Sequence, residues 1–245
     1  MKRQNHNPFL LALKARNLSV EIHHHAAYQI VLSDDTPFNS TIGGIHYEQI
    51  HGFLIKPHVS HFCVAEKGTL SVLNIEAYSN IGLELARRLK EGQDYIVFDS
   101  LAETNLFFQT PKESLDVNKV VDALLATLPN AKYDERVIKI IDYIKVNYFE
   151  QNITPQTFSD MVFLSPSRLA SLFKAQTGSS LSKYLLWTRL REAIYLILSD
   201  KARSLTDIAY DTGFYDLPQF NKYMYEMFGM PPKALKHNSD LIAIY

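Results

Sequence analysis

The stretch SLTDIAYDTGFYDLPQFNKYMYEMFGMPPKALKH, residues 204–237, decides the fold of this chain. Its first part predicts a short helix whose apolar face carries Ile208 and Ala209. Gly213 ends that helix, because glycine readily supplies the positive φ that a tight turn between crossing helices requires. Asp216 is then the predicted N-cap of a second helix, since its side chain can accept a hydrogen bond from the first helical turn.

The second helix of this stretch has a regular apolar stripe. Phe220, Met224 and Phe228 recur every four residues, which places them on one buried face. Gly229 follows as a C-cap, and Pro231-Pro232 prevents the helix from continuing. Residues 204–237 therefore predict a helix-turn-helix.

A second copy of this unit lies upstream, in SPSRLASLFKAQTGSS, residues 165–180. Four positions precede their counterparts by 51 residues: Ser165, Leu169, Phe173 and Gly178 correspond to Asp216, Phe220, Met224 and Gly229. One such pattern would fit any helical hairpin, whereas two copies predict an internal repeat of one supersecondary unit.

These motifs resemble those of the AraC family of bacterial transcription regulators, over residues 134–237. The family's second-repeat pattern, I-A-x-x-x-G-F followed by F-x-(R/K)-x-F and F-G-x-x-P, corresponds to Ile208-Ala209, Gly213-Phe214, Phe220, Lys222, Phe228-Gly229 and Pro232, with Met224 replacing the second Phe. The first-repeat pattern, S-x-x-x-L-x-x-x-F-K-x-x-x-G, corresponds to Ser165, Leu169, Phe173-Lys174 and Gly178. The linker motif Y-L-x-x-x-R-L-x-x-A corresponds to Tyr184-Leu185, Arg189-Leu190 and Ala193.

The resemblance implies a sequence-specific DNA-binding transcription regulator. Activation is the commoner outcome in the family, so we expect an activator that also contacts RNA polymerase. The expected partners are double-stranded DNA at two adjacent major-groove segments, a second copy in a homodimer, and a small-molecule effector bound by the N-terminal domain.

The fold class that follows is α+β with two domains. Residues 1–129 are the predicted sensing and dimerisation domain, a small cupin-like β-barrel with two following helices. Residues 134–237 are the predicted DNA-binding domain, all α, with about seven helices. A linker helix over residues 181–199 would be about 28 Å long at 1.5 Å per residue, comparable to one DNA turn of about 34 Å.

Side chains on the outward faces of the two recognition helices are the predicted DNA contacts. They are Ser167, Arg168, Ala170, Ser171 and Lys174 on the first helix, and Pro218, Gln219, Asn221 and Lys222 on the second. Gln219 can pair with adenine and Lys222 with guanine or phosphate, whereas the small side chains of the first helix cannot make bidentate base contacts. We therefore expect the second helix to specify more of the sequence. Arg189 and Arg191 on the linker helix are read either as phosphate contacts or as structural residues.

Seven of the nine histidines lie within residues 17–78, the β-rich segment of the predicted N-terminal domain: His23, His24, His25, His46, His51, His58 and His61. The segment resembles a cupin in His23-x-His25 and in the later Gly52, Pro57 and His61, but it lacks a Glu after His25 at the cupin spacing. Three imidazoles are a usable metal ligand set. We interpret them instead as polar strand positions or as the lining of a ligand pocket formed by His23, His25, Tyr28 and His61. We predict no cofactor and no metal ion.

Two amphipathic helices are predicted after the strands, over residues 79–90 and 110–128. The second opens with a capping box at Thr110, Pro111 and Glu113. Its stripe Val117, Val121, Leu124 and Leu128 either packs on the barrel or forms the homodimer interface, and we favour the interface.

Composition limits the protein class. The formal net charge is −1, whereas residues 165–237 carry ten Lys or Arg against six Asp or Glu. This excess fits a few phosphate contacts rather than a broad basic face. The single cysteine, Cys63, fits a reducing compartment, and no apolar run approaches the length of a membrane span. We expect a cytoplasmic protein.

Two other classes remain open at this point. One is a metal-dependent cupin enzyme fused to a DNA-binding domain. The other is an interaction protein whose helical domain has lost DNA binding, which the small side chains of the first recognition helix would suit. The sequence lacks G-x-S-x-G, Walker and H-E-x-x-H motifs, so we predict that the protein is not an enzyme.

Overall fold

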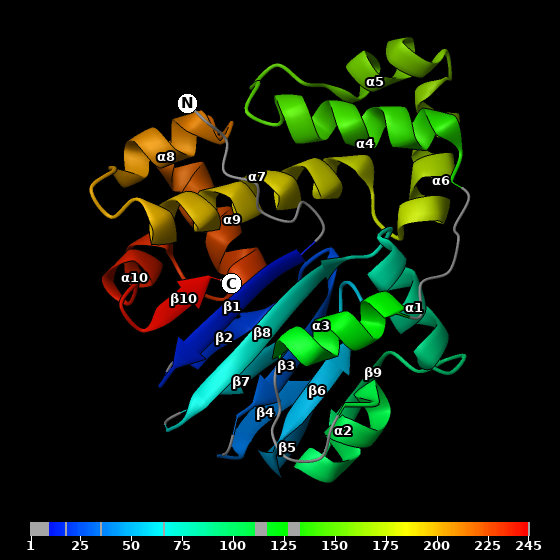
Figure 1. The fold of residues 1–245 in the computed structure, drawn as a ribbon. Coiled ribbons are helices and arrows are strands. Elements are labelled where there is room, and N and C mark those ends of the chain that lie inside the picture. The colour runs from blue at the N-terminus through cyan, green and yellow to red at the C-terminus, as the bar shows by residue number, and fades with distance from the viewer. Residues whose placement is uncertain are drawn as a thin grey trace.

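The computed structural model describes residues 10–17, 19–34, 36–65, 67–110, 117–126 and 133–244. It consists of a β-rich N-terminal part and a helical C-terminal part stacked on it (Figure 1). This arrangement confirms the predicted order of a sheet-rich region followed by a helical domain.

Two antiparallel sheets make the N-terminal part. The larger has the order β10-β1-β8-β3-β6-β9 and contains β1 (Leu10–Arg16), β3 (Ala27–Ser33), β6 (Gly52–Ile55), β8 (Thr69–Glu76), β9 (Tyr95–Phe98) and β10 (Ile242–Ile244). The smaller has the order β2-β7-β4-β5 and contains β2 (Ser19–His23), β4 (Phe38–Ile42), β5 (Ile45–Ile50) and β7 (His61–Val64). Apolar side chains from both sheets, such as Phe38, Phe53 and Cys63, fill the space between them.

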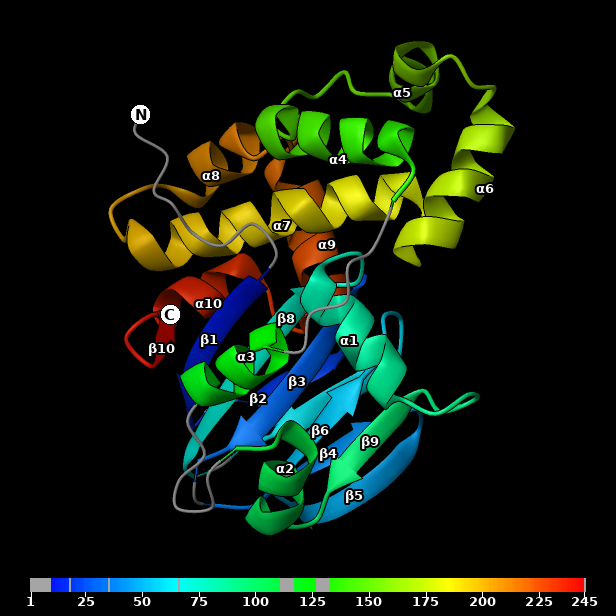
Figure 2. The same cartoon turned by 45° about the vertical axis from the view of Figure 1, so that its right-hand side comes forward.

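Helices cover the other face of the large sheet (Figure 2). They are α1 (Asn80–Arg88), α2 (Leu101–Phe108) and α3 (Val117–Ala126). The sequence predicted α1, and it predicted α3 within a longer helix over residues 110–128, but it missed α2. The capping signal for α2 is nevertheless present, because Ser100 accepts from the N–H of Glu103 and Glu103 accepts from the N–H of Asp99.

The apolar stripe of α3 packs against other parts of the same chain. Val120 and Leu124 are fully buried against α1 and the large sheet. Leu124 is therefore not available for the homodimer interface that we expected, and the alternative of packing on the sheet is the correct one for it. The side chain of Val117, residue Leu128, and the capping box at Pro111 and Glu113 lie outside the described residues.

The C-terminal part has seven helices within the continuously described residues 133–244. They are α4 (Glu135–Asn147), α5 (Pro155–Val162), α6 (Pro166–Thr177), α7 (Leu181–Ser199), α8 (Leu205–Asp211), α9 (Leu217–Phe228) and α10 (Pro232–His237). The linker helix α7 has the predicted bounds. None of the described helices has the length and apolar character that a membrane span requires.

The two parts share one hydrophobic core, which the sequence did not predict. Phe220 of α9 and Trp187 of α7 belong to the same buried cluster as Leu11 and Leu13 of β1. Beyond the predicted boundary at residue 237, the chain returns to the N-terminal part, where β10 pairs with β1 at the edge of the large sheet. The two parts are thus joined by a packed interface as well as by the chain itself.

Candidate nucleic-acid interface and histidine cluster

The first helix-turn-helix unit consists of α5 and α6. Thr154 caps α5 in a capping box with Thr157. Gly178 ends α6 in the left-handed conformation, as predicted. The turn between the two helices uses Phe163 at φ 53°, where the second copy has Gly213. The Phe163 side chain is 93% exposed.

The second unit consists of α8 and α9. Gly213 has φ 87°, which confirms the positive φ predicted for this turn. Asp216 caps α9 by accepting from the N–H of Gln219 at 2.7 Å. The side chain of Gln219 in turn accepts from the N–H of Tyr215 at 2.9 Å, so its carbonyl oxygen is already used in the cap.

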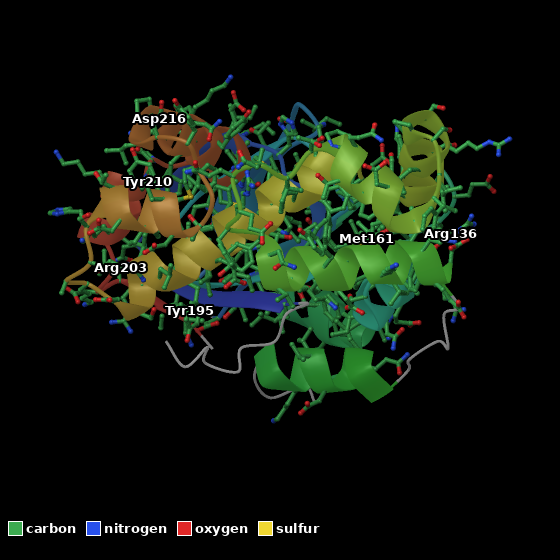
Figure 3. The ribbon with its side chains drawn as sticks, turned by 90° about the horizontal axis from the view of Figure 1, so that it is seen from above. Arg136, Met161, Tyr195, Arg203, Tyr210 and Asp216 are labelled. Atoms are coloured by element: carbon green, nitrogen blue, oxygen red, sulfur yellow. The ribbon has the colours of Figure 1, made fainter. Side chains whose placement is uncertain are left out.

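Helix α7 connects the two units and holds them at opposite ends. Seen from above, Tyr210 and Asp216 of the second unit lie at one end of the helical part, and Met161 of the first unit lies toward the other (Figure 3). Fully buried Phe173 and Phe220 anchor α6 and α9 in their respective cores. Helix α7 therefore holds the two recognition helices in a fixed relative position.

The predicted contacts of α6 are all exposed: Ser167, Arg168, Ala170, Ser171 and Lys174. Neither Arg168 nor Lys174 forms an ion pair with any residue that the structure describes. On α9, Pro218 and Lys222 are exposed, whereas Gln219 and Asn221 are half-buried. Lys222 lies 3.9 Å from the carboxylate of Glu226 one turn later, which offsets part of its charge.

Sequence reasoning missed Tyr215, an exposed aromatic residue immediately before α9. It lies next to Asp216 and the start of the recognition helix, where a ring can contact sugar or a thymine methyl. The sequence could have predicted the exposure of Tyr215, because this residue falls outside the apolar stripes of both helices of the unit.

The two linker arginines are structural. Arg189 donates to the carbonyl oxygens of Tyr148 and Glu150 at 2.7 Å each, so it ties α7 to the end of α4. Arg191 is buried and donates to Glu76 of β8 at 2.6 Å.

Glu76 connects the helical part to the sheet. It also accepts from the indole N–H of Trp187 at 3.0 Å, and the hydroxyl of Tyr184 donates to that of Tyr78 at 2.9 Å nearby. Burial raises the pKa of Glu76 to about 7, and the charge of Arg191 opposes that shift. This group of hydrogen bonds fixes the linker helix on the end of β8.

A groove of about 400 Å³ lies between the helical part and the small sheet. The start of α5, the helices α7 and α9, and the N-terminal residues His24 and His58 line it. Burial, followed by the positive charge of Lys183, lowers the pKa of His58.

The structure brings together three of the four residues predicted to line a ligand pocket. His23, His25 and His61 are buried beside one another, with one ring nitrogen of each within 4.8 Å of the others. Tyr28 lies on the face of β3 that the helices cover, away from the histidines, and it packs in the same cluster as Ile30. The expected four-residue pocket is therefore not assembled, but a cluster of three imidazoles is.

Comparison with known proteins shows relationships for both parts. Residues 158–238 match a family described as a helix-turn-helix domain. The probable transcriptional regulator LumQ of Photobacterium leiognathi is 24% identical over 86% of this chain and 89% of its own length. The transcriptional activator RhaS of an Enterobacter species is 25% identical over 64% of this chain and 54% of its own length. The helical part is thus similar to the AraC-type helix-turn-helix domains of transcription regulators.

A likeness to a solved structure covers almost the whole fold. ToxT from Vibrio cholerae aligns over 93% of this chain and 98% of its own, with a TM-score of 0.58 at 13% identity. That likeness supports the predicted two-domain fold.

Other relatives match over a smaller part of their own length. YobQ of Bacillus subtilis is 30% identical, but the match covers 39% of that protein. The match spans 40% of this chain.

Proposed function

We propose that this protein regulates transcription by binding duplex DNA with α6 and α9 in two adjacent major-groove segments. The observation that carries the proposal is the repeated unit, with two recognition helices anchored at the ends of one 19-residue helix. A helix of that length spans about 28 Å at 1.5 Å per residue, which is close to the rise of one DNA turn. Residues 134–237 are the DNA-binding unit in this proposal, and residues 1–129 with β10 form the controlling unit.

The proposal assigns different roles to the two recognition helices. Arg168 and Lys174 of α6 contact phosphates and position the protein, because the neighbouring Ala170 and Ser171 offer no bidentate base contact. Lys222 and the amide of Gln219 on α9 read base edges. The proposed sign of regulation is activation, which matches the printed name of RhaS and implies contact with RNA polymerase.

A binding selection on randomised duplex DNA with the full chain tests this function. We expect enrichment of two half-sites about 10 base pairs apart, with affinity that falls steeply as salt is raised. A folded protein that shows no salt-sensitive DNA binding at low ionic strength would refute the proposal. That outcome would favour the alternative in which the protein is an interaction partner that has lost DNA binding.

The substitution Lys174→Ala tests the positioning role of α6. We expect weaker binding to all sequences alike, and a salt dependence flatter by about one unit in the slope of log K against log salt concentration. Fluorescence anisotropy over a salt series measures both. Lys201→Ala is a matched control, because Lys201 is exposed and already paired with Asp240 away from α6. A loss of base preference in Lys174→Ala would contradict the assignment.

The substitution Gln219→Glu tests the reading role of α9 separately from its cap. A glutamate keeps the acceptor that holds the N–H of Tyr215, but it removes the amide donor needed to pair with adenine. We expect unchanged thermal stability and a changed base preference in one half-site, with a discrimination of about 1–3 kcal/mol lost at one base pair. A selection profile identical to that of the wild type would show that Gln219 serves only as a cap.

A further inference from the structure

Strand pairing assembles the histidine cluster. His23 ends β2 and is directly opposite His61, the first residue of β7. Their ring centroids are 4.2 Å apart, and the ring of His25 lies 5.2 Å from that of His61 and 5.8 Å from that of His23. The exposed fractions of the three side chains are 5%, 1% and 0% for His23, His25 and His61. Three imidazoles thus share one space that bulk water does not reach.

Backbone hydrogen bonds fix the orientation of all three rings. The Nδ1 atoms of His23, His25 and His61 lie 2.8, 3.1 and 2.9 Å from the carbonyl oxygens of Glu21, Ala27 and Val59. A carbonyl only accepts, so each Nδ1 carries the proton and each Nε2 keeps its lone pair. In metal sites, a hydrogen bond of this kind from the ring nitrogen that does not bind the metal orients the histidine ligand.

The Nε2 atoms of His25 and His61 have no hydrogen-bond partner among the described residues, although both are buried. Buried polar atoms are nearly always paired, so two unpaired acceptors in one cluster indicate a partner that the polypeptide does not supply.

The small cavity that adjoins the cluster does not fit an organic effector. The cavity beside His23 has a volume of about 60 Å³ and is lined mainly by apolar side chains, including Val31 and Cys63. Pockets for small organic ligands measure about 300–1,000 Å³. His25 and His61 do not line this cavity, so it adjoins the histidine cluster through His23.

We propose that His23, His25 and His61 bind a single divalent transition-metal ion, with Zn²⁺ as the reference, through their Nε2 atoms. Imidazole ligands suit zinc, copper, nickel and iron. Zn–N bonds of about 2.1 Å place tetrahedral ligands about 3.4 Å apart, so the ring nitrogens close in by small rotations. Among the described residues, no fourth His, Cys, Asp or Glu joins the group. The fourth position is taken by water or by a small ligand.

The position of the site connects the ion to the DNA-binding unit. Two backbone hydrogen bonds join β2 and the residue after it to the end of α9: Glu21 N–H donates to Gly229 at 2.8 Å, and His24 N–H donates to Glu226 at 3.3 Å. The ring of His25 also lies 5.2 Å from that of Trp187 on α7. Coordination would hold β2 against β7, and with it the contact to the second recognition helix. Control of DNA binding by the ion rests on the proposed function, whereas metal binding does not.

Metal binding is tested on the full chain after removal of metal with a chelator. Zn²⁺ titration by calorimetry is expected to give one ion per chain with an affinity of about 1 μM or tighter. Co²⁺ is expected to give the visible absorption of a four-coordinate site. Cu²⁺ is expected to quench Trp187, which is the only tryptophan of the sequence and lies beside His25.

Matched variants separate this site from surface histidines. His25→Gln and His61→Gln are each expected to bind Zn²⁺ at least tenfold more weakly and to lose the rise in Tm that Zn²⁺ gives the wild type. His24→Gln is the control, because His24 is the exposed residue between two of the ligands, and it is expected to behave like the wild type. Circular dichroism of the metal-free proteins shows whether each variant folds. If neither cluster variant folds, the Co²⁺ spectrum and the X-ray absorption ligand count of the wild type decide.

The proposal is overturned if the wild type binds no ion, or if both cluster variants fold and bind like His24→Gln. A DNA selection with and without one equivalent of Zn²⁺ tests the coupling. A change in affinity of threefold or more that His61→Gln abolishes supports it. Metal binding with unchanged DNA affinity refutes control by the ion. Metal binding without any DNA binding refutes the proposed function and leaves the metal site standing.

Discussion

Glu76→Ala is expected to destabilise the protein by about 3–5 kcal/mol, which is the usual effect of breaking a buried ion pair. The substitution removes the closest carboxylate of the buried Arg191 guanidinium and the acceptor of the Trp187 indole N–H. Desolvation of a charge is costly, so an uncompensated guanidinium at this depth should account for most of the loss. Urea unfolding followed by the fluorescence of Trp187 measures it.

The double variant Glu76→Leu with Arg191→Met is the matched control. It removes both charges and retains apolar volume, so we expect it to recover most of the stability lost in Glu76→Ala. A second control is Asp240→Ala, because Asp240 pairs with Lys201 at the exposed surface. We expect a much smaller cost for that pair, since solvent screens exposed ion pairs. If Glu76→Ala costs no more than Asp240→Ala, the buried pair does not hold the two parts together.

Phe220→Ala is expected to destabilise both parts of the protein, whereas Phe173→Ala should act mainly on the first unit. Both side chains are fully buried, and loss of a buried phenylalanine costs about 3–5 kcal/mol. Phe220 shares its core with Leu11 and Leu13 of β1. Phe173 instead packs among α4, α5 and the first half of α7, with Tyr78 as the contribution from the N-terminal part.

Hydrogen exchange distinguishes these two effects, because local opening reports on each cooperative unit separately. Phe220→Ala is expected to accelerate exchange of the amides of β1, which pair with β8 and β10. Phe173→Ala is expected to leave β1 protected and to accelerate exchange in α6. Equal acceleration of β1 in the two variants would show that the cores are not divided as the packing indicates.

The sequence alone was sufficient for the local structure of the DNA-binding unit. N-caps, glycines with positive φ and four-residue apolar spacing act over one or two helical turns, so Asp216, Gly229 and the bounds of α7 could be predicted without tertiary information. The outward residues of α6 followed from the same periodicity. For Gln219 the prediction was incomplete, because the sequence does not show that its carbonyl oxygen is already used in the cap of α9.

The tertiary structure alone decided how distant residues meet. Glu76 and Arg191 are 115 residues apart in the chain, and β10 joins the N-terminal sheet from the far end of the sequence. The three histidines were visible as a group in the sequence, but only the pairing of β2 with β7, with its register shift between Val20 and His23, places His23 opposite His61. A shift of one residue in a strand would turn these side chains to the other face, and local sequence rules do not fix that register. The sequence thus determined the local structure of the helices in the C-terminal part. Long-range strand pairing and the shared core determined which polar side chains were buried together.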